Sequence, residues 1–243
     1  MRERLIVLAL LWMATGLCAQ SANDAIKPAT VHAYALAELG WHAEAVKALQ
    51  NLHGESGSGA ALVEEQKLLE FSGQHTQTCS DESPCMAEDL LAVGRLPEAL
   101  TAQKQQIKEI QQAQRANLRK GDERSGGNMT VQLGNETDST GGRLVALADA
   151  YDLQARIEAA MGRTGLALKS LNAAEKALPS TAKTVPRAAG YAYHRALILA
   201  EDLKFAEAAK ACDASMRLDA DSVVLGSWRQ LGCKAIAELA VGR

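Results

Sequence analysis

The feature that most constrains the fold of this chain is a pair of short amphipathic segments within residues 190–218. In each segment, small and apolar residues recur at steps of three and four, which places them on one face of a helix. The segments meet at Asp202–Lys204. A lone helical hairpin cannot bury its apolar face, so the pattern predicts that this hairpin packs against others like it. The apolar positions of the second segment are Phe205, Ala208, Ala209, Cys212 and Met216.

The composition favours helices over sheets. Only 4% of the 243 residues are aromatic, and five prolines interrupt the chain. An apolar fraction of 47% is enough for a packed core. The formal net charge of −3 is small for this length, so it does not indicate binding to nucleic acid or to anionic lipid. We therefore predict an all-α protein.

The N-terminus has the pattern of a secretory signal peptide. Two arginines precede an apolar run over residues 5–17, which Cys18 and Ala19 follow. We predict a signal peptide over 1–19 and export to the periplasm or the extracellular space. A membrane anchor is the alternative, but the run is shorter than the roughly 18 residues that a spanning helix needs. A lipoprotein signal lipidated at Cys18 is a further alternative, although a leucine stands directly before this cysteine.

Four cysteines remain after the predicted cleavage, and an even number in an oxidising compartment indicates disulfides. Cys79–Cys85 would close a short loop. Cys212–Cys233 would join the last hairpin to a terminal helix, whose outer face has no following repeat to cover it. Unpaired, buried thiols are the alternative for the second pair. His75 with the first pair lacks a fourth zinc ligand, so we expect no metal and no cofactor.

The composition changes within residues 119–142, which are rich in Gly, Ser, Asn, Asp and Thr. A structureless loop of this length is uncommon inside a compact domain. We therefore interpret this range as a flexible linker between two helical lobes. The predicted N-terminal lobe covers 28–118, and the predicted C-terminal lobe covers 143–243.

Several predicted turns carry a small residue and then an alanine early in the second helix. They are Gly40…Glu44-Ala45, Gly94…Glu98-Ala99, Gly162…Leu166-Ala167 and Phe205-Ala206-Glu207-Ala208. Pro179 ends one predicted hairpin, and Trp228-Arg-Gln-Leu231-Gly232 opens the terminal helix. These residues resemble the tetratricopeptide repeat, a unit of two antiparallel helices of about 34 residues. The resemblance implies a solenoid of stacked hairpins. An antiparallel helical bundle of unrelated origin is the alternative.

No motif indicates catalysis. The chain has no Walker loop, no dinucleotide fingerprint and no pair of histidines with metalloprotease spacing. None of the histidines stands in a recognisable nucleophile context. They are His32, His42, His53, His75 and His194. We expect a protein that is not an enzyme and has no catalytic residues.

The resemblance to tetratricopeptide repeats implies a concave surface that binds a peptide or protein segment. On that basis we expect an exported interaction scaffold or adaptor, with a protein partner and no nucleic acid. First-helix residues expected to face the groove are Tyr34, Asp152, Arg156, Tyr193 and Arg229. Aromatic and arginine side chains are common anchors in such surfaces. The alternative is a structural or assembly subunit of an oligomer or envelope complex.

Overall fold

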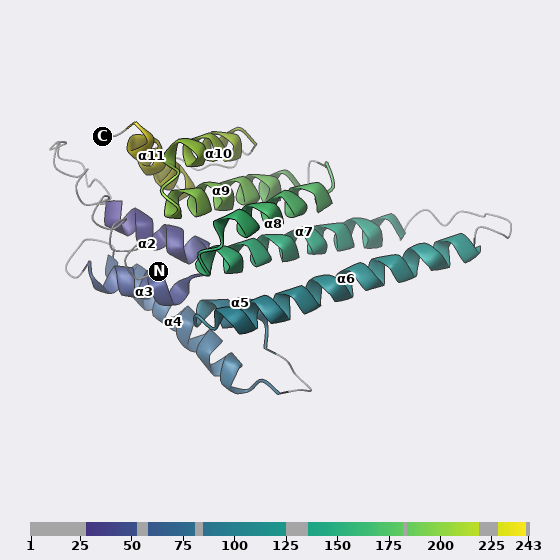
Figure 1. Cartoon of the computed structure of the whole chain (residues 1–243). Coiled ribbons are helices and arrows are strands. Elements are labelled where there is room, and N and C mark those ends of the chain that lie inside the picture. The colour runs from purple at the N-terminus through teal and green to yellow at the C-terminus, as the bar shows by residue number, and fades with distance from the viewer. Residues whose placement is uncertain are drawn as a thin grey trace.

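The computed structural model describes residues 28–52, 58–80, 85–124, 136–181, 184–218 and 228–241, so the predicted signal peptide and Cys18 lie outside the described residues. Within these ranges the chain forms ten α-helices (Figure 1). In order they are α2 (Pro28–Glu38), α3 (His42–Gln50), α4 (Ser58–Gln77), α5 (Ala87–Ala92), α6 (Leu96–Arg124), α7 (Glu136–Ala160), α8 (Thr164–Ala177), α9 (Val185–Glu201), α10 (Phe205–Leu218) and α11 (Trp228–Ala240). The predicted all-α class is confirmed.

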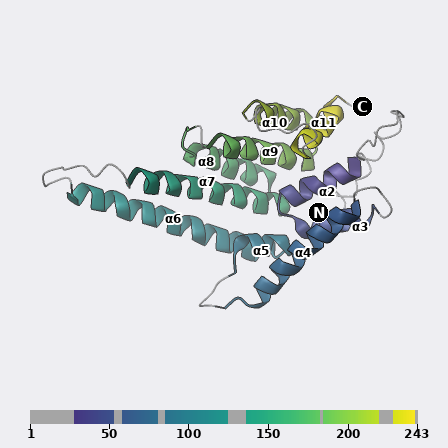
Figure 2. The same cartoon turned by 180° about the vertical axis from the view of Figure 1, so that it is seen from behind.

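Helices that follow one another in the chain pack side by side, as both views of the fold show (Figures 1 and 2). The pairs α7–α8 and α9–α10 have the broadest contacts, and α6–α7 and α2–α3 come next. α6 and α7 also pack together, and they extend into the range 119–142 from its two sides. No helix in the described ranges has both the length and the apolar character that crossing a membrane requires.

Four of the turns between paired helices have the same backbone geometry. Gly40, Gly94 and Gly162 adopt left-handed φ angles of 77°, 79° and 74°. Leu203 takes the same role with φ 61°. At each turn this residue bonds to the carbonyl three residues before it, and the next residue bonds to the carbonyl five residues before it. This is the Schellman arrangement, which satisfies the last carbonyls of a helix.

A fully buried alanine lies five residues after each of these turn residues. The four are Ala45, Ala99, Ala167 and Ala208, each with an exposed fraction of 0%. A side chain as small as a methyl group lets the second helix of each hairpin lie close against its neighbour. The same turn and the same alanine therefore recur in four hairpins, which accounts for the spacing seen in the sequence.

One apolar cluster runs through most of the fold, from Leu36 of α2 to Ile236 of α11. It includes residues from both predicted lobes, 28–118 and 143–243. The division of the chain into these two lobes stays a prediction. α2 also packs directly on α11, where Val31 contacts Leu231 and Leu239. The expectation that no other part of the chain covers the outer face of α11 is therefore wrong, because α2 packs on this helix.

Both predicted disulfides are present. The Cα atoms are 5.2 Å apart in Cys79–Cys85 and 5.4 Å apart in Cys212–Cys233, within the range that a disulfide requires. The first closes the connection between α4 and α5, and the second joins α10 to α11. Two disulfides indicate an oxidising, extracytoplasmic compartment.

Candidate functional site

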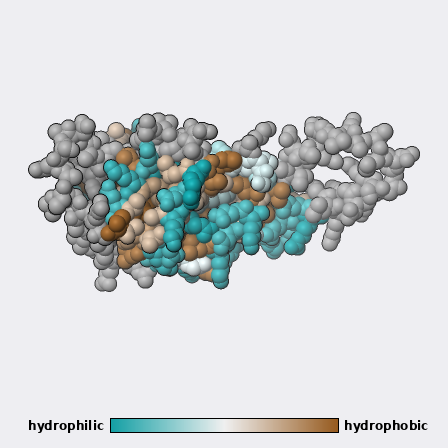
Figure 3. Space-filling view, turned by 90° about the horizontal axis from the view of Figure 1, so that it is seen from above, coloured by the Kyte–Doolittle hydropathy of each residue, from teal (hydrophilic) through white to brown (hydrophobic). Residues whose placement is uncertain are grey.

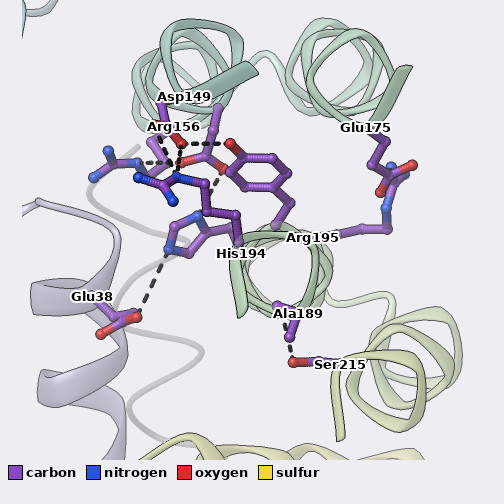
Figure 4. A network of polar contacts seen from close by, with 11 residues as sticks. Glu38, Asp149, Arg156, Glu175, Ala189, His194, Arg195 and Ser215 are labelled. Carbon is purple, nitrogen blue, oxygen red and sulfur yellow. Dashed lines mark hydrogen bonds and ion pairs between the residues drawn. The ribbon is translucent and has the colours of Figure 1, made fainter. Parts of the chain in front are cut away.

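An extended network of polar side chains lies where α2, α7 and α9 face one another (Figure 4). α7 contributes three charged residues at steps of three and four, so they share one face of the helix. α9 contributes residues with the same kind of spacing. The members are Glu38 of α2, Asp149, Asp152 and Arg156 of α7, and Arg187, Tyr191 and His194 of α9.

Asp152 is the centre of this network. Its Oδ1 lies 2.8 Å from Nδ1 of His194, and its Oδ2 lies 3.2 Å from Nε of Arg156. Burial raises the pKa of Asp152, but the nearby charges of His194 and Arg156, together with the hydrogen bond to His194, outweigh that effect and hold the pKa below its usual 3.8. The carboxylate is therefore ionised at neutral pH. The side chain of Asp152 is only 5% exposed, and it connects α7 to α9.

Arg156 connects the network to the turn between α2 and α3. Its guanidinium lies over Gly40, where a Cβ atom would be 3.1 Å from Nη1. Trp41 donates a hydrogen bond from Nε1 to the backbone carbonyl of Arg156, at 3.2 Å. The Nε of Arg156 is buried and poorly aligned for hydrogen bonding, so its contact with Asp152 is an ion pair rather than a directional bond.

The outer part of the network is accessible to solvent. Tyr191 donates a hydrogen bond of 2.6 Å to Asp149, and Nε of Arg187 lies 3.2 Å from the same carboxylate. Burial and this hydrogen bond raise the pKa of Tyr191, so its hydroxyl keeps its proton. Glu38 lies 3.9 Å from Nε2 of His194. The side chains of Glu38 and Asp149 are 48% and 46% exposed, and we call these two carboxylates with Arg187 the rim.

The five residues predicted to face a groove lie in three separate places. Asp152 and Arg156 contact each other inside the network. The guanidinium of Arg229 lies over the ring of Tyr193, with 5.6 Å between its Cζ and the ring centroid. Tyr34 packs against a smaller apolar cluster shared by α2, α3 and α4. Burial and the nearby carboxylates of α4 raise the pKa of Tyr34.

Tyr193 is buried in the main apolar cluster, where burial raises its pKa. Sequence reasoning did not include Glu38 or His194 among the site residues. One signal could have found His194, because it directly follows Tyr193 and stands three residues after Tyr191 on the same helix. Glu38 has no such signal, since its role depends on the approach of α2 to α9.

The arrangement is suited to holding helices together and presenting charge. Within the described ranges, the side chains paired with His194 are the carboxylates of Glu38 and Asp152. No group of three or more potential metal ligands occurs in the part of the chain that the structure describes. On the face seen in Figure 3, hydrophobic residues lie in small groups between hydrophilic ones.

Comparison of the chain with protein-family models, with curated proteins and with solved structures found no match.

Proposed function

We propose that this protein is an exported, non-catalytic scaffold of stacked helical hairpins that binds a protein or peptide segment across α2, α7 and α9. The observation that supports this most is the rim, where Glu38, Asp149 and Arg187 are half exposed beside the buried pair of Asp152 and His194. The resemblance of the turns to tetratricopeptide repeats supports the same reading, because stacked hairpins present first-helix residues on one surface.

The rim is suited to binding because its side chains are already held in place. Asp149 has two partners on α9, and Glu38 faces the imidazole of His194. A side chain held by neighbours loses little conformational entropy when a partner binds. Ion pairs between these carboxylates and basic side chains of a partner would fix the register of a bound segment.

Charge reversal at the rim tests this proposal. Glu38→Arg places a cation where a partner would meet a carboxylate, and the matched control is Glu175→Arg. Glu175 is 44% exposed and is paired with Arg195 on the α8–α9 side of the fold. We expect the exported full-length protein to capture a specific partner from the medium or periplasm of its own cell. Glu38→Arg should lose that capture and Glu175→Arg should keep it.

Equal capture by both variants would contradict binding at the rim. Circular dichroism should first show that both variants keep the helical content of the unchanged protein, so that a loss of capture is not a loss of folding. Quantification of the captured protein by mass spectrometry gives the comparison.

A structural subunit of an assembly is the second candidate. It is supported by the pair α6–α7, which extends beyond α8 and α9 and offers two long helices for lateral packing (Figure 1). Light scattering over a range of concentrations tests it. A mass that rises to a fixed multiple of the monomer supports the assembly role, and a constant monomer mass contradicts self-assembly.

A further inference from the structure

A second surface lies on α4 and at the start of α5, away from the network described above. α4 packs mainly on α3 and α5, and it forms one edge of the molecule in both views (Figures 1 and 2). Large apolar side chains on this part of the chain are exposed to solvent. They are Val63, Leu68, Phe71 and Met86, and we call them the α4 face.

Contacts within α4 and between α4 and α5 hold the α4 face in place. The ring of Phe71 lies 4.5 Å from the ring of His75, centroid to centroid. Nδ1 of His75 lies 3.2 Å from Oδ2 of Asp89 in the first turn of α5. Met86 stands three residues before Asp89, and the Cys79–Cys85 disulfide closes the connection between the helices. These contacts and the disulfide therefore hold in place the two helices that carry the exposed apolar side chains.

α4 buries a charged residue while it leaves an aromatic residue exposed. Phe71 is 57% exposed, whereas Glu65 on the same helix is 9% exposed. Glu65 is directed toward α3, where its Oε2 lies 2.6 Å from Nδ1 of His42. An apolar group of this kind on a soluble protein often marks a binding site. The inward pair of Glu65 and His42 fixes which side of α4 faces solvent.

Charge on these two helices indicates what kind of partner fits. α4 and α5 together contain five carboxylates and one lysine, Lys67. With histidines neutral, their net charge is more negative than the −3 of the entire chain. Glu64, Glu70 and Glu88 are exposed beside the apolar residues. A second copy of this surface would bring like charges together, whereas a basic partner would be attracted.

We infer that the α4 face binds a basic amphipathic helix of a partner protein. Its apolar side would cover Phe71, Leu68 and Met86, and its lysine or arginine side chains would meet the surrounding carboxylates. Amphipathic helices bind apolar surfaces in this way, through anchors that recur at steps of three and four. The inference deepens the proposed binding function and rests on it, but it uses a surface that the rim does not share.

A synthetic helix tests the chemistry directly. The probe is a fluorescently labelled peptide of about 18 leucine and lysine residues, long enough to form a helix, with leucines at steps of three and four. A matched peptide has glutamate in place of every lysine. The variants of the full chain are Phe71→Glu and, as a control, Leu166→Glu, an exposed leucine on α8.

We expect the basic peptide to bind and the acidic peptide not to bind, measured by fluorescence anisotropy. Phe71→Glu should weaken binding by about tenfold or more, because it removes an aromatic anchor. Leu166→Glu should leave the affinity unchanged. Raising the salt concentration should weaken binding, since the attraction between exposed charges is screened.

Three results would overturn the inference: equal binding of the two peptides, equal effects of the two variants, or no binding of the basic peptide. Self-association that Phe71→Glu abolishes would also overturn it, because the face would then bind a second copy. The Glu38→Arg variant separates this test from the rim proposal. It should bind the basic peptide with unchanged affinity, even if it captures no partner through the rim.

Discussion

Replacement of Gly232 by alanine tests the packing of the terminal helix. A Cβ atom at Gly232 would lie well inside van der Waals contact with Oη of Tyr193, and 3.4 Å from its Cζ. The ring cannot move away freely, because Tyr193 is buried and the guanidinium of Arg229 lies over its face. An added group in a packed core costs about 1–3 kcal/mol of stability. The helix preference of alanine over glycine offsets about 1 kcal/mol of that cost.

Gly190→Ala is the matched control. Gly190 is also inside a helix, α9, but a Cβ atom there would meet nothing within 4 Å. This substitution should raise the free energy of unfolding by about 0.5–1 kcal/mol, through the helix preference alone. Both variants share that preference, so the difference between them isolates the collision with Tyr193. We expect a difference of about 1–3 kcal/mol, with Gly232→Ala the less stable.

Urea unfolding followed by far-UV circular dichroism measures both free energies. Tyr193→Phe supplies an internal check, since it removes the oxygen atom with which the new methyl group collides. In a double-mutant cycle, Gly232→Ala should be less destabilising in the Tyr193→Phe background than in the unchanged protein. If the two alanine variants were equally stabilised, the close packing of α11 on Tyr193 would be refuted.

Three further predictions concern other parts of the fold. Leu203→Gly should raise the urea midpoint and stabilise the protein by about 1 kcal/mol, because Leu203 holds a left-handed φ of 61° that disfavours L-residues; an unchanged midpoint would refute this. Asp152→Asn should lower stability at neutral pH by about 3 kcal/mol, since the buried contact with His194 then lacks the negative charge of the carboxylate. The pKa of Asp152 is depressed on folding, so the stability that its carboxylate contributes is present above its ordinary pKa and is lost as pH falls through the folded pKa. The free energies of unfolding of Asp152→Asn and of the unchanged protein should therefore converge in acid. A difference that stays constant with pH would contradict the reasoning. Reduction of Cys212–Cys233 should cost about 3 kcal/mol, and hydrogen exchange should show α11 losing protection first; unchanged exchange in α11 would count against the disulfide as its anchor.

Local chemistry determined the elements of this fold. The steps of three and four in the apolar pattern predict helices wherever they occur. Gly40, Gly94 and Gly162 are the residues that a left-handed helix end prefers, so glycine marks three of the four predicted turns. The apolar pattern alone predicted the fourth turn, at Asp202–Lys204, but it did not indicate the left-handed conformation of Leu203, which leucine adopts only where the surrounding structure compensates for its strain.

The cysteines were a partly local prediction. An even number of them indicated disulfides, while the sequence allowed three pairings and left free thiols open for Cys212 and Cys233. Contact between α10 and α11 brings the Cα atoms of this pair to 5.4 Å. The distance is a property of how two helices cross, which no spacing along the chain specifies.

Only the tertiary structure decided which faces are covered. α2 packs against α11, and Glu38 lies beside His194, although each of these pairs joins segments that are far apart in the chain. For the same reason the sequence did not show that Phe71 is exposed while Glu65 is buried. Helical periodicity defines the faces of a helix, but the neighbours that those faces meet depend on distances between residues far apart in the chain.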